Sequence, residues 1–271
     1  MEKYSVLMSV YHKEQPEFLR LSMESMFSQT AKPDEFLLIC DGPLTEGLDE
    51  VIESMLQMHP DILQVVRLPE NRGLANALNA GLPLCRNDLV ARMDSDDIAA
   101  PQRCELQLRQ FSLDPRLVIS GGAIDEFEGS PDNVITHKSM PEIHEQILSY
   151  ARKRCPFNHP TVMYRKSAVL ELGGYPEIPL HEDYGLWANL LMAGHRGYNH
   201  PQTLCAMRVD TGLYGRRGGM AYFRTAAAFR RELYRKGFYT LGSYLLVVSA
   251  LAVVCLIPTG LRKAVYRKVL R

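Results

Sequence analysis

The stretch Leu89-Val90-Ala91-Arg92-Met93-Asp94-Ser95-Asp96-Asp97 places three carboxylates within four residues, directly after an apolar run. Carboxylates this close repel one another unless solvent or a cation screens them. Open α/β sheets bind ligands beyond the carboxyl ends of their strands, and carboxylates at alternate positions suit Mg²⁺ or Mn²⁺ shared with substrate phosphates. The alternative is a helix cap, because Asp96 or Asp97 could cap a helix that begins near Pro101.

Apolar, β-rich runs alternate with helical patterns on both sides of this stretch. The expected strands are residues 4–11, 36–40, 62–68, 88–93 and 117–120. The expected helices are residues 16–28, 48–58, 73–82, 101–111, 142–153, 166–172 and 183–192. This alternation through short loops predicts an α/β fold with a Rossmann-like, doubly wound and mostly parallel sheet. The looser, polar segment 123–140 is expected to be an antiparallel excursion.

The chain has a net charge of zero, but its two parts carry opposite charges. Residues 1–207 contain 18 Lys or Arg and 29 Asp or Glu, whereas residues 208–271 contain 13 Lys or Arg and two acidic residues. Inside the basic part, positions 238–257 are mostly apolar and uncharged. Because basic residues flank a segment of about bilayer length, we expect residues 216–271 to form a helical, membrane-associated tail at an anionic surface.

Two arrangements of this tail are open. Residues 238–257 either dip into one leaflet or cross the bilayer once, while a second basic helix over 261–271 lies on the lipid surface. The alternative is a buried helix of the globular domain. Residues 1–215 are expected to form that domain, on the cytoplasmic face of the cell membrane. The chain opens on an expected strand rather than a signal peptide, and its six cysteines lack disulfide or zinc spacing.

Four polar segments lie at the ends of expected strands or in the loops that follow, and two further glycine-containing segments lie between them in the sequence. These segments are Ser9-Val10-Tyr11, Asp41-Gly42-Pro43, Asn71-Arg72-Gly73-Leu74-Ala75, Asp94-Ser95-Asp96-Asp97, Gly173-Gly174-Tyr175 and His181-Glu182-Asp183. Their order and spacing resemble those of family 2 glycosyltransferases with the GT-A fold, close to the bacterial enzymes that build capsule, exopolysaccharide and O-antigen. The resemblance covers about residues 4–215. The chain departs from it at Cys40, where the family usually has the first of two aspartates, so the nucleotide base stays open.

The resemblance implies an inverting glycosyltransferase that moves a sugar from a nucleotide-sugar, UDP-linked, to a lipid-linked oligosaccharide in surface polysaccharide biosynthesis. Asp183 would be the catalytic base, and Asp96 would bind a divalent cation, Mn²⁺ or Mg²⁺. The nucleotide-sugar site would comprise Ser9, Tyr11, Asp41, Asn71, Arg72, Asp94, Ser95 and Asp96. Acceptor or diphosphate contacts would come from His159, His181, Glu182, Arg216 and Arg217, with Arg208 beginning the same basic region.

Structural roles compete with several of these assignments. Asp41 could be only a turn residue before Gly42, and Arg72 only a solvated residue at a helix start. Glu182 and Asp183 would also suit the positive end of a helix dipole, which is compatible with catalysis. A lone histidine is more often structural than functional.

Two other functions are open. A sugar-1-phosphate nucleotidyltransferase would need a glycine-rich, lysine-containing loop after the first strand, and Tyr11-His12-Lys13-Glu14 has no glycine. A non-catalytic nucleotide-sugar-binding membrane protein would have no need of Asp94, Asp96 and Asp183. Nucleic-acid binding is not expected, because the basic tail lacks interleaved aromatic residues. The absence of a Q-x-x-R-W loop favours addition of a single sugar.

Overall fold

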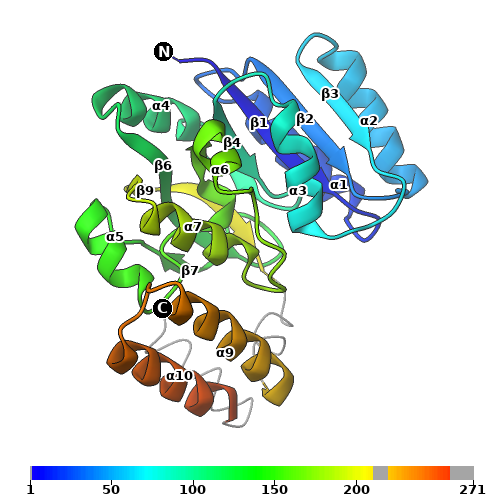
Figure 1. Cartoon of the computed structure of the whole chain (residues 1–271). Helices are drawn as coiled ribbons and strands as arrows, with labels where there is room; N and C mark the ends of the chain where they lie inside the picture. The colour runs from blue at the N-terminus through cyan, green and yellow to red at the C-terminus, as the bar shows by residue number, and fades with distance from the viewer. Residues whose placement is uncertain (1, 210–218, 257–271) are drawn as a thin grey trace.

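The computed structural model describes residues 2–209 and 219–256 (Figure 1). Within them, nine strands form one sheet in the order β3-β2-β1-β4-β8-β6-β9-β5, and β7 pairs with β6 beside this path. The strands are β1 (Tyr4–Val10), β2 (Glu35–Cys40), β3 (Leu63–Arg67), β4 (Leu89–Met93), β5 (Ile98–Ala99), β6 (Leu117–Phe127), β7 (Val134–Lys138), β8 (Met163–Arg165) and β9 (Arg196–Arg208). The α/β fold with a wound sheet is therefore confirmed.

Helices connect the strands and cover both faces of the sheet (Figure 1). The α-helices are α1 (Pro16–Phe27), α2 (Glu46–Met58), α3 (Leu74–Gly81), α4 (Arg103–Leu113), α5 (His144–Ala151), α6 (Lys166–Glu171), α7 (Glu182–Met192), α9 (Gly219–Arg235) and α10 (Leu241–Leu256). Two short 3₁₀ helices, η1 (Leu82–Leu84) and η2 (His159–Thr161), complete the described elements. The seven helices expected between residues 16 and 192 all exist, and their ends differ from the expected ones by at most two residues.

The first four strands run parallel, and their register aligns their carboxyl ends. Val10 at the end of β1 pairs with Cys40 at the end of β2, and Met8 pairs with Met93 at the end of β4. The residues that follow these strands therefore meet at one edge of the sheet. This is the edge at which wound α/β sheets bind ligands.

The second half of the sheet is mixed. β8 runs antiparallel to both β4 and β6, whereas β6 and β9 are parallel and share a bulged register. The expected strand 117–120 is too short, because β6 continues through Gly121 and Gly122 to Phe127. A Cβ at Gly121 would lie 2.6 Å from Asn199 Oδ1 of β9, so the glycines permit the close approach of that strand. Pairing of β7 with β6 confirms the antiparallel excursion.

Two apolar cores fill the spaces between sheet and helices. Alternate residues of β1 enter different cores, with Leu7 on one side and Val6 and Met8 on the other. The first core contains residues of α3, α6, α7 and α9, including the fully buried Trp187. The second contains residues of α1, α2 and α4. The helices on two faces make the sheet doubly wound, as expected.

The C-terminal part forms a helical hairpin of α9 and α10, which packs on the domain (Figure 1). Phe229 and Leu233 of α9, with Phe238 and Tyr239 of the turn, are buried in the same core as Trp187. The 16 residues of α10 are uncharged. Among the described residues, no helix combines the length and the apolarity needed to cross a bilayer. The expected second helix over 261–271 lies outside the described residues.

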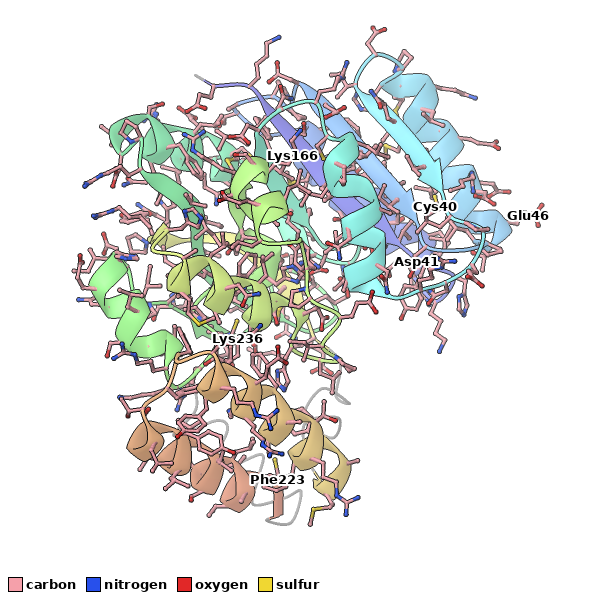
Figure 2. All side chains as sticks on the ribbon, viewed as in Figure 1. Cys40, Asp41, Glu46, Lys166, Phe223 and Lys236 are labelled. Carbon is pink, nitrogen blue, oxygen red and sulfur yellow. The ribbon has the colours of Figure 1, made fainter. Side chains whose placement is uncertain are left out.

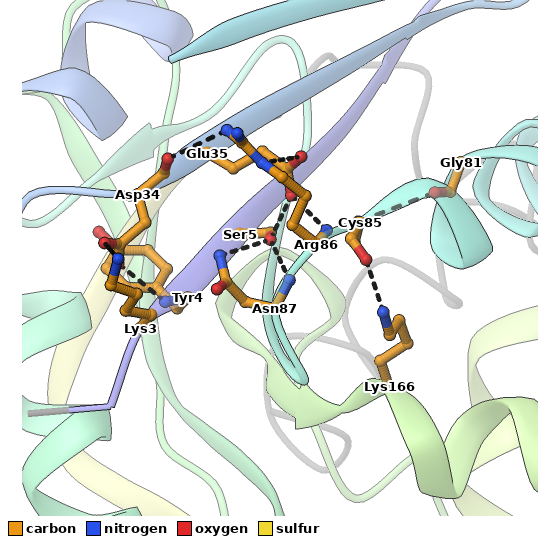
Figure 3. A network of polar contacts seen from close by, with 10 residues as sticks. All are labelled: Lys3, Tyr4, Ser5, Asp34, Glu35, Gly81, Cys85, Arg86, Asn87 and Lys166. Atoms are coloured by element: carbon orange, nitrogen blue, oxygen red, sulfur yellow. Dashed lines mark hydrogen bonds and ion pairs between the residues drawn. The ribbon is translucent and has the colours of Figure 1, made fainter. Parts of the chain in front are cut away.

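A buried polar network joins β1, β2 and the segment before β4 at the amino ends of these strands, away from the ligand-binding edge (Figure 3). Glu35 is fully buried. Its carboxylate accepts hydrogen bonds from the Ser5 hydroxyl at 2.5 Å and from the backbone N–H of Arg86 at 2.7 Å. Arg86 Nε also donates to it at 3.0 Å, and Asn87 donates to the Ser5 hydroxyl.

Replacing Glu35 with Ala is expected to lower the free energy of unfolding by about 2–3 kcal/mol. The substitution would leave the Ser5 hydroxyl and the Arg86 N–H without their acceptor in a buried place. Urea unfolding followed by circular dichroism measures the change. Glu50→Ala, at an exposed position of α2, is the matched control and should keep the midpoint of the parent chain. Equal midpoints for both variants would contradict the structural role of Glu35.

Candidate active site

A cavity of about 1040 Å³ opens at the carboxyl ends of β1, β2 and β4. Seven of the eight residues expected in the nucleotide-sugar site line it. These are Ser9, Tyr11, Asp41, Asn71, Asp94, Ser95 and Asp96. Residues far apart in the chain are brought together because the parallel register ends the three strands at one level. Cys40 and Asp41 mark the end of β2 in Figure 2.

Asp94 is held by a buried cation. Both terminal nitrogens of Arg92 donate to the two oxygens of Asp94. Arg92 is only 1% exposed and lies within β4, with its Nε unpaired among the described residues. A bidentate guanidinium–carboxylate pair fixes orientation as well as distance. The buried Arg92 therefore fixes the orientation of the Asp94 carboxylate, which lines the cavity.

Asp96 lies near two other carboxylates, those of Asp94 and Glu14. Burial, followed by the charges of Asp94 and Glu14, raises the pKa of Asp96 to about 7. Burial, followed by the charges of Asp94 and Asp96, also raises the pKa of Asp97. The Asp97 carboxylate accepts a hydrogen bond from the backbone N–H of Arg208 at 2.8 Å. Asp97 thus holds the end of β9 rather than capping a helix. Glu14 accepts a hydrogen bond from the Ser95 hydroxyl at 2.6 Å.

Asp41 clamps the neighbouring loop through the main chain. Its two carboxylate oxygens accept the backbone N–H groups of Arg72 and Gly73, each at 2.9 Å. Asn71 donates to the Asp41 carbonyl at 3.2 Å and lines the cavity. Gly42, with φ of 86°, passes so close that a Cβ would lie 2.6 Å from the Asn71 nitrogen. Contact of Asp41 with a nucleotide base stays a prediction.

Arg72 does not line the large cavity, and its contact with a nucleotide-sugar stays a prediction. Its guanidinium pairs with Glu70 at 2.7 Å on the exposed surface. The backbone clamp at Asp41 turns the main chain of the loop toward the cavity, and the Arg72 side chain then points to solvent. This geometry fits the alternative interpretation of Arg72, a solvated residue at the start of a helix.

Arg208 is a further cavity residue that the sequence pattern grouped with the basic tail. Its guanidinium carbon lies 3.7 Å from the ring centre of Phe18 and 4.6 Å from that of Phe127. Its Nε donates to the Asp96 carbonyl at 3.2 Å. Cation–π contacts with two aromatic rings hold the guanidinium in place. Lys13, which also lines the cavity, adds a second cation.

Asp183 and Glu182 lie in the first turn of α7 and do not line this cavity. Burial raises the pKa of Asp183, and the backbone N–H of Tyr184 and the thiol of Cys155 partly offset this. The Cys155 sulfur is 3.6 Å from Asp183 Oδ2. Burial also raises the pKa of Glu182. The positive charge of Arg92 acts on both carboxylates, so one buried cation connects Asp94 electrostatically with Asp183.

The two expected histidines also lie outside the cavity lining. His159 Nε2 is 3.2 Å from the Tyr175 hydroxyl, and its ring packs edge-on against Trp187. Burial, with the charge of Arg92, lowers the pKa of His159 well below its usual value, so the ring is neutral. His181 stacks on Phe229 of α9 at 4.8 Å between ring centres. Arg216 and Arg217 lie outside the described residues.

A family model described as Glycosyl transferase family 2 matches residues 5–173. The chain belongs to this family. It is therefore a glycosyltransferase, and the matched region contains β1, the Asp41 clamp and the Asp94–Asp97 cluster. The match ends at Gly173, so Glu182 and Asp183 lie beyond it.

Relatives extend the likeness over nearly the whole family 2 chain. An uncharacterized glycosyltransferase of Haemophilus influenzae is 40% identical over 99% of both chains. A UDP-Gal:alpha-D-GlcNAc-diphosphoundecaprenol beta-1,3-galactosyltransferase of Escherichia coli is 36% identical over 99% of this chain and 97% of its own. The amylovoran biosynthesis glycosyltransferase AmsE of Erwinia amylovora is 38% identical over 86% of this chain and 84% of its own.

Solved structures confirm the fold of this family 2 member. A mannosyltransferase of Pyrobaculum calidifontis was solved in complex with GDP-Man and Mn²⁺. It aligns with a TM-score of 0.67 at 18% identity, over 99% of this chain and 76% of the mannosyltransferase chain. Staphylococcus aureus TarS 1–349, in complex with UDP-GlcNAc, has a TM-score of 0.63 at 16% identity over 85% of this chain and 66% of its own. At these identities, the likeness establishes the GT-A fold alone.

The residues of this glycosyltransferase suit a cation that is shared with a substrate. The described residues contain no group of three His, Cys, Asp or Glu side chains arranged as a complete metal cage. Yet burial, followed by the charges of Asp94 and Glu14, raises the pKa of Asp96. A divalent cation would relieve the repulsion among these carboxylates. Mg²⁺ and Mn²⁺ are commonly held by one or two carboxylates with phosphate oxygens as further ligands.

Proposed function

We propose that this protein is an inverting glycosyltransferase that transfers one sugar from a nucleotide-sugar to a lipid-linked glycan during polysaccharide biosynthesis. The observation that carries the proposal is the cavity at the carboxyl edge of the sheet, which carboxylates and two cations line together. Asp94 and Asp96 lie in the same cavity as Lys13 and Arg208. A nucleoside diphosphate bound through a cation needs both kinds of charge. The volume of the cavity suits a ligand of nucleotide-sugar size.

The donor is proposed to be a UDP-sugar. The Escherichia coli relative is named for a UDP-Gal donor and is 36% identical over nearly the full chain. Tyr11 and Asn71 line the cavity, and the base and ribose are proposed to bind beside them. Asp94 would contact the ribose or support the cation, and the Arg92 pair fixes its direction for that purpose.

A divalent cation held by Asp96 would stabilise the departing nucleoside diphosphate as a Lewis acid. The chain's own groups would act around it. Arg208 and Lys13 would neutralise phosphate charge from the cavity wall. Glu14 holds the Ser95 hydroxyl and so fixes the turn between Asp94 and Asp96.

The acceptor is proposed to be a lipid diphosphate-linked glycan, as the name of the Escherichia coli relative states for that enzyme. Asp183 would take the proton from the attacking hydroxyl, because a general base works best with a pKa near the operating pH and burial raises that of Asp183. Attack from the face opposite the leaving group inverts the anomeric centre without a covalent intermediate. Glu182, His159 and His181 would shape the acceptor side.

The test is release of nucleoside diphosphate from a panel of nucleotide-sugars, with Mn²⁺, Mg²⁺ or EDTA. We expect release from one UDP-sugar that requires a divalent cation, and a loss of at least about 100-fold in kcat/KM for Asp96→Asn. Asp61→Asn, an exposed carboxylate after α2, is the matched control and should keep the parent rate. Release that is insensitive to EDTA and to Asp96→Asn would contradict the proposed site. Turnover of a GDP-sugar alone would contradict only the donor.

A further inference from the structure

α10 exposes an apolar face that the described domain leaves uncovered. The helix has no charged residue, and a helix that is apolar on all sides is normally buried in a core or in a membrane. Only one side of α10 is packed, where Tyr244 stacks on Tyr234 of α9 at 4.9 Å. On the other side, Leu245 is 54% exposed and Leu246 is 68% exposed.

The exposed side of α10 is continuous along the helix. Leu241 and Val253 are also exposed, at positions that helical spacing places with Leu245 and Leu246 on one face. Ser249 and Ala250, which lie between them, are exposed as well. Contiguous exposed apolar surface on a folded protein marks a site of contact with another apolar body.

Basic residues stand on the neighbouring helix. Arg224, Arg231 and Arg235 of α9 are exposed, and their spacing of seven and four residues places them on one face. This face is turned away from Ala226, Phe229 and Leu233, which α9 buries in the domain core. The sequence after α10 adds further basic residues at 262, 263, 267, 268 and 271. The hairpin thus has an exposed apolar face on α10 and an exposed basic face on α9.

We propose that the α9–α10 hairpin docks flat on an anionic lipid bilayer, with the exposed face of α10 in the interface and the arginines of α9 against lipid phosphates. The charge separates this occupant from a protein partner or a second copy of the chain, because an apolar face together with exposed arginines complements anionic headgroups over acyl chains. The packed side of α10 excludes lipid from half of the helix. The hairpin therefore lies on the membrane instead of crossing it.

Docking would position the acceptor side of the enzyme. Phe229 of α9 stacks on His181 and packs edge-on against Tyr184 at 5.2 Å, on either side of Glu182 and Asp183. The hydroxyl of Tyr239 is 3.2 Å from that of Tyr184. A bilayer under the hairpin would bring the first turn of α7 close to lipid headgroups. This last step rests on the proposed lipid-linked acceptor, whereas the docking itself does not.

Flotation of the full chain with lipid vesicles tests the proposal. We expect the protein to float with phosphatidylcholine vesicles that contain phosphatidylglycerol, and to float less with phosphatidylcholine alone or at high salt. Leu245→Glu with Leu246→Glu should weaken binding at least about 100-fold, because full burial of each leucine is worth about tenfold or more. Arg231→Ala and Arg235→Ala should each weaken binding to the anionic vesicles about fivefold.

Leu113→Glu is the matched control, since Leu113 is 78% exposed at the end of α4, far from the hairpin (Figure 1). It should float like the parent chain. Leu245→Ser with Leu246→Ser repeats the test without added charge, and circular dichroism reports whether each variant folds. Figure 2 labels Phe223, in the N-terminal part of α9, and Lys236, directly after its last residue.

Three results would overturn the docking proposal. The parent chain could stay unbound with both kinds of vesicle, or the leucine variants could float as well as the parent. The third is a dimer in solution that the leucine substitutions dissociate, without vesicle binding, which would make the face a contact between copies. None of these measurements involves sugar transfer, so failure here is distinguishable from failure of the proposed reaction.

Discussion

Asp183→Asn is expected to lower kcat for sugar transfer by about 10²–10⁴, the usual contribution of a general base. The Kd for the nucleotide-sugar should remain within about twofold, because Asp183 does not line the cavity that contains Asp94 and Asp96. Steady-state transfer to a lipid-linked acceptor measures kcat, and calorimetry measures donor binding. A loss confined to kcat would support Asp183 as a group that acts only in the chemical step.

The pH profile gives a second readout of the same residue. A carboxylate base is active when deprotonated, so kcat/KM falls as the pH drops through its pKa. Because burial raises the pKa of Asp183, the acid limb should lie above the usual aspartate range. Glu182→Gln changes the neighbouring carboxyl and is the control, with an expected loss well below that of Asp183→Asn. Full activity in Asp183→Asn, with the loss in Glu182→Gln, would move the base assignment to Glu182.

Arg92→Met is expected to lower the free energy of unfolding by about 3–5 kcal/mol, the range for removing one partner of a buried ion pair. The variant would leave Asp94, Asp96 and Asp97 together without their buried cation. Donor binding should fall as well, because Asp94 would lose the bidentate contact that fixes it. Urea unfolding is the suitable measurement, since guanidinium chloride would screen the repulsion.

A double-mutant cycle separates this charge effect from loss of packing. Adding Asp94→Asn to Arg92→Met should recover at least about 1 kcal/mol, because the two residues are in direct contact. Arg67→Met is the control, since its pair with Asp49 is half-exposed, and it should cost no more than about 1 kcal/mol. Strict additivity between positions 92 and 94 would show that their ion pair contributes nothing to stability.

The parallel half of the fold was predictable from the sequence because its signals are local. Each of β1 to β4 is a mostly apolar run, and the intervening helices have their own periodicity. β9 was not predicted, because its 13 residues include Pro201 and several polar side chains. Its strand conformation depends on pairing with the glycines of β6, which is a tertiary effect.

The residues that line the cavity were easier to predict from the sequence than the residues that hold them in place. Residues that follow strands were found because strand ends are visible in the pattern. The surface position of the Arg72 side chain beside Glu70 was not visible, because it accompanies a backbone contact to Asp41 from a distant strand. Arg92 stood out in the sequence only as a charge inside an apolar run. Its pairing with Asp94 depends on side-chain direction within β4. Arg208 reaches the cavity through β9, so its place there required the strand that the sequence did not reveal.

The loop at Asn71 is held through its backbone N–H groups, so its position does not depend on the side chain of residue 72. Asp41 grips the amide groups of residues 72 and 73, which every amino acid except proline provides. A substitution that removes the Arg72 side chain is therefore expected to leave the loop and the cavity wall beside it in place. Loss of the Asp41 carboxylate, by contrast, would remove both contacts that hold the loop.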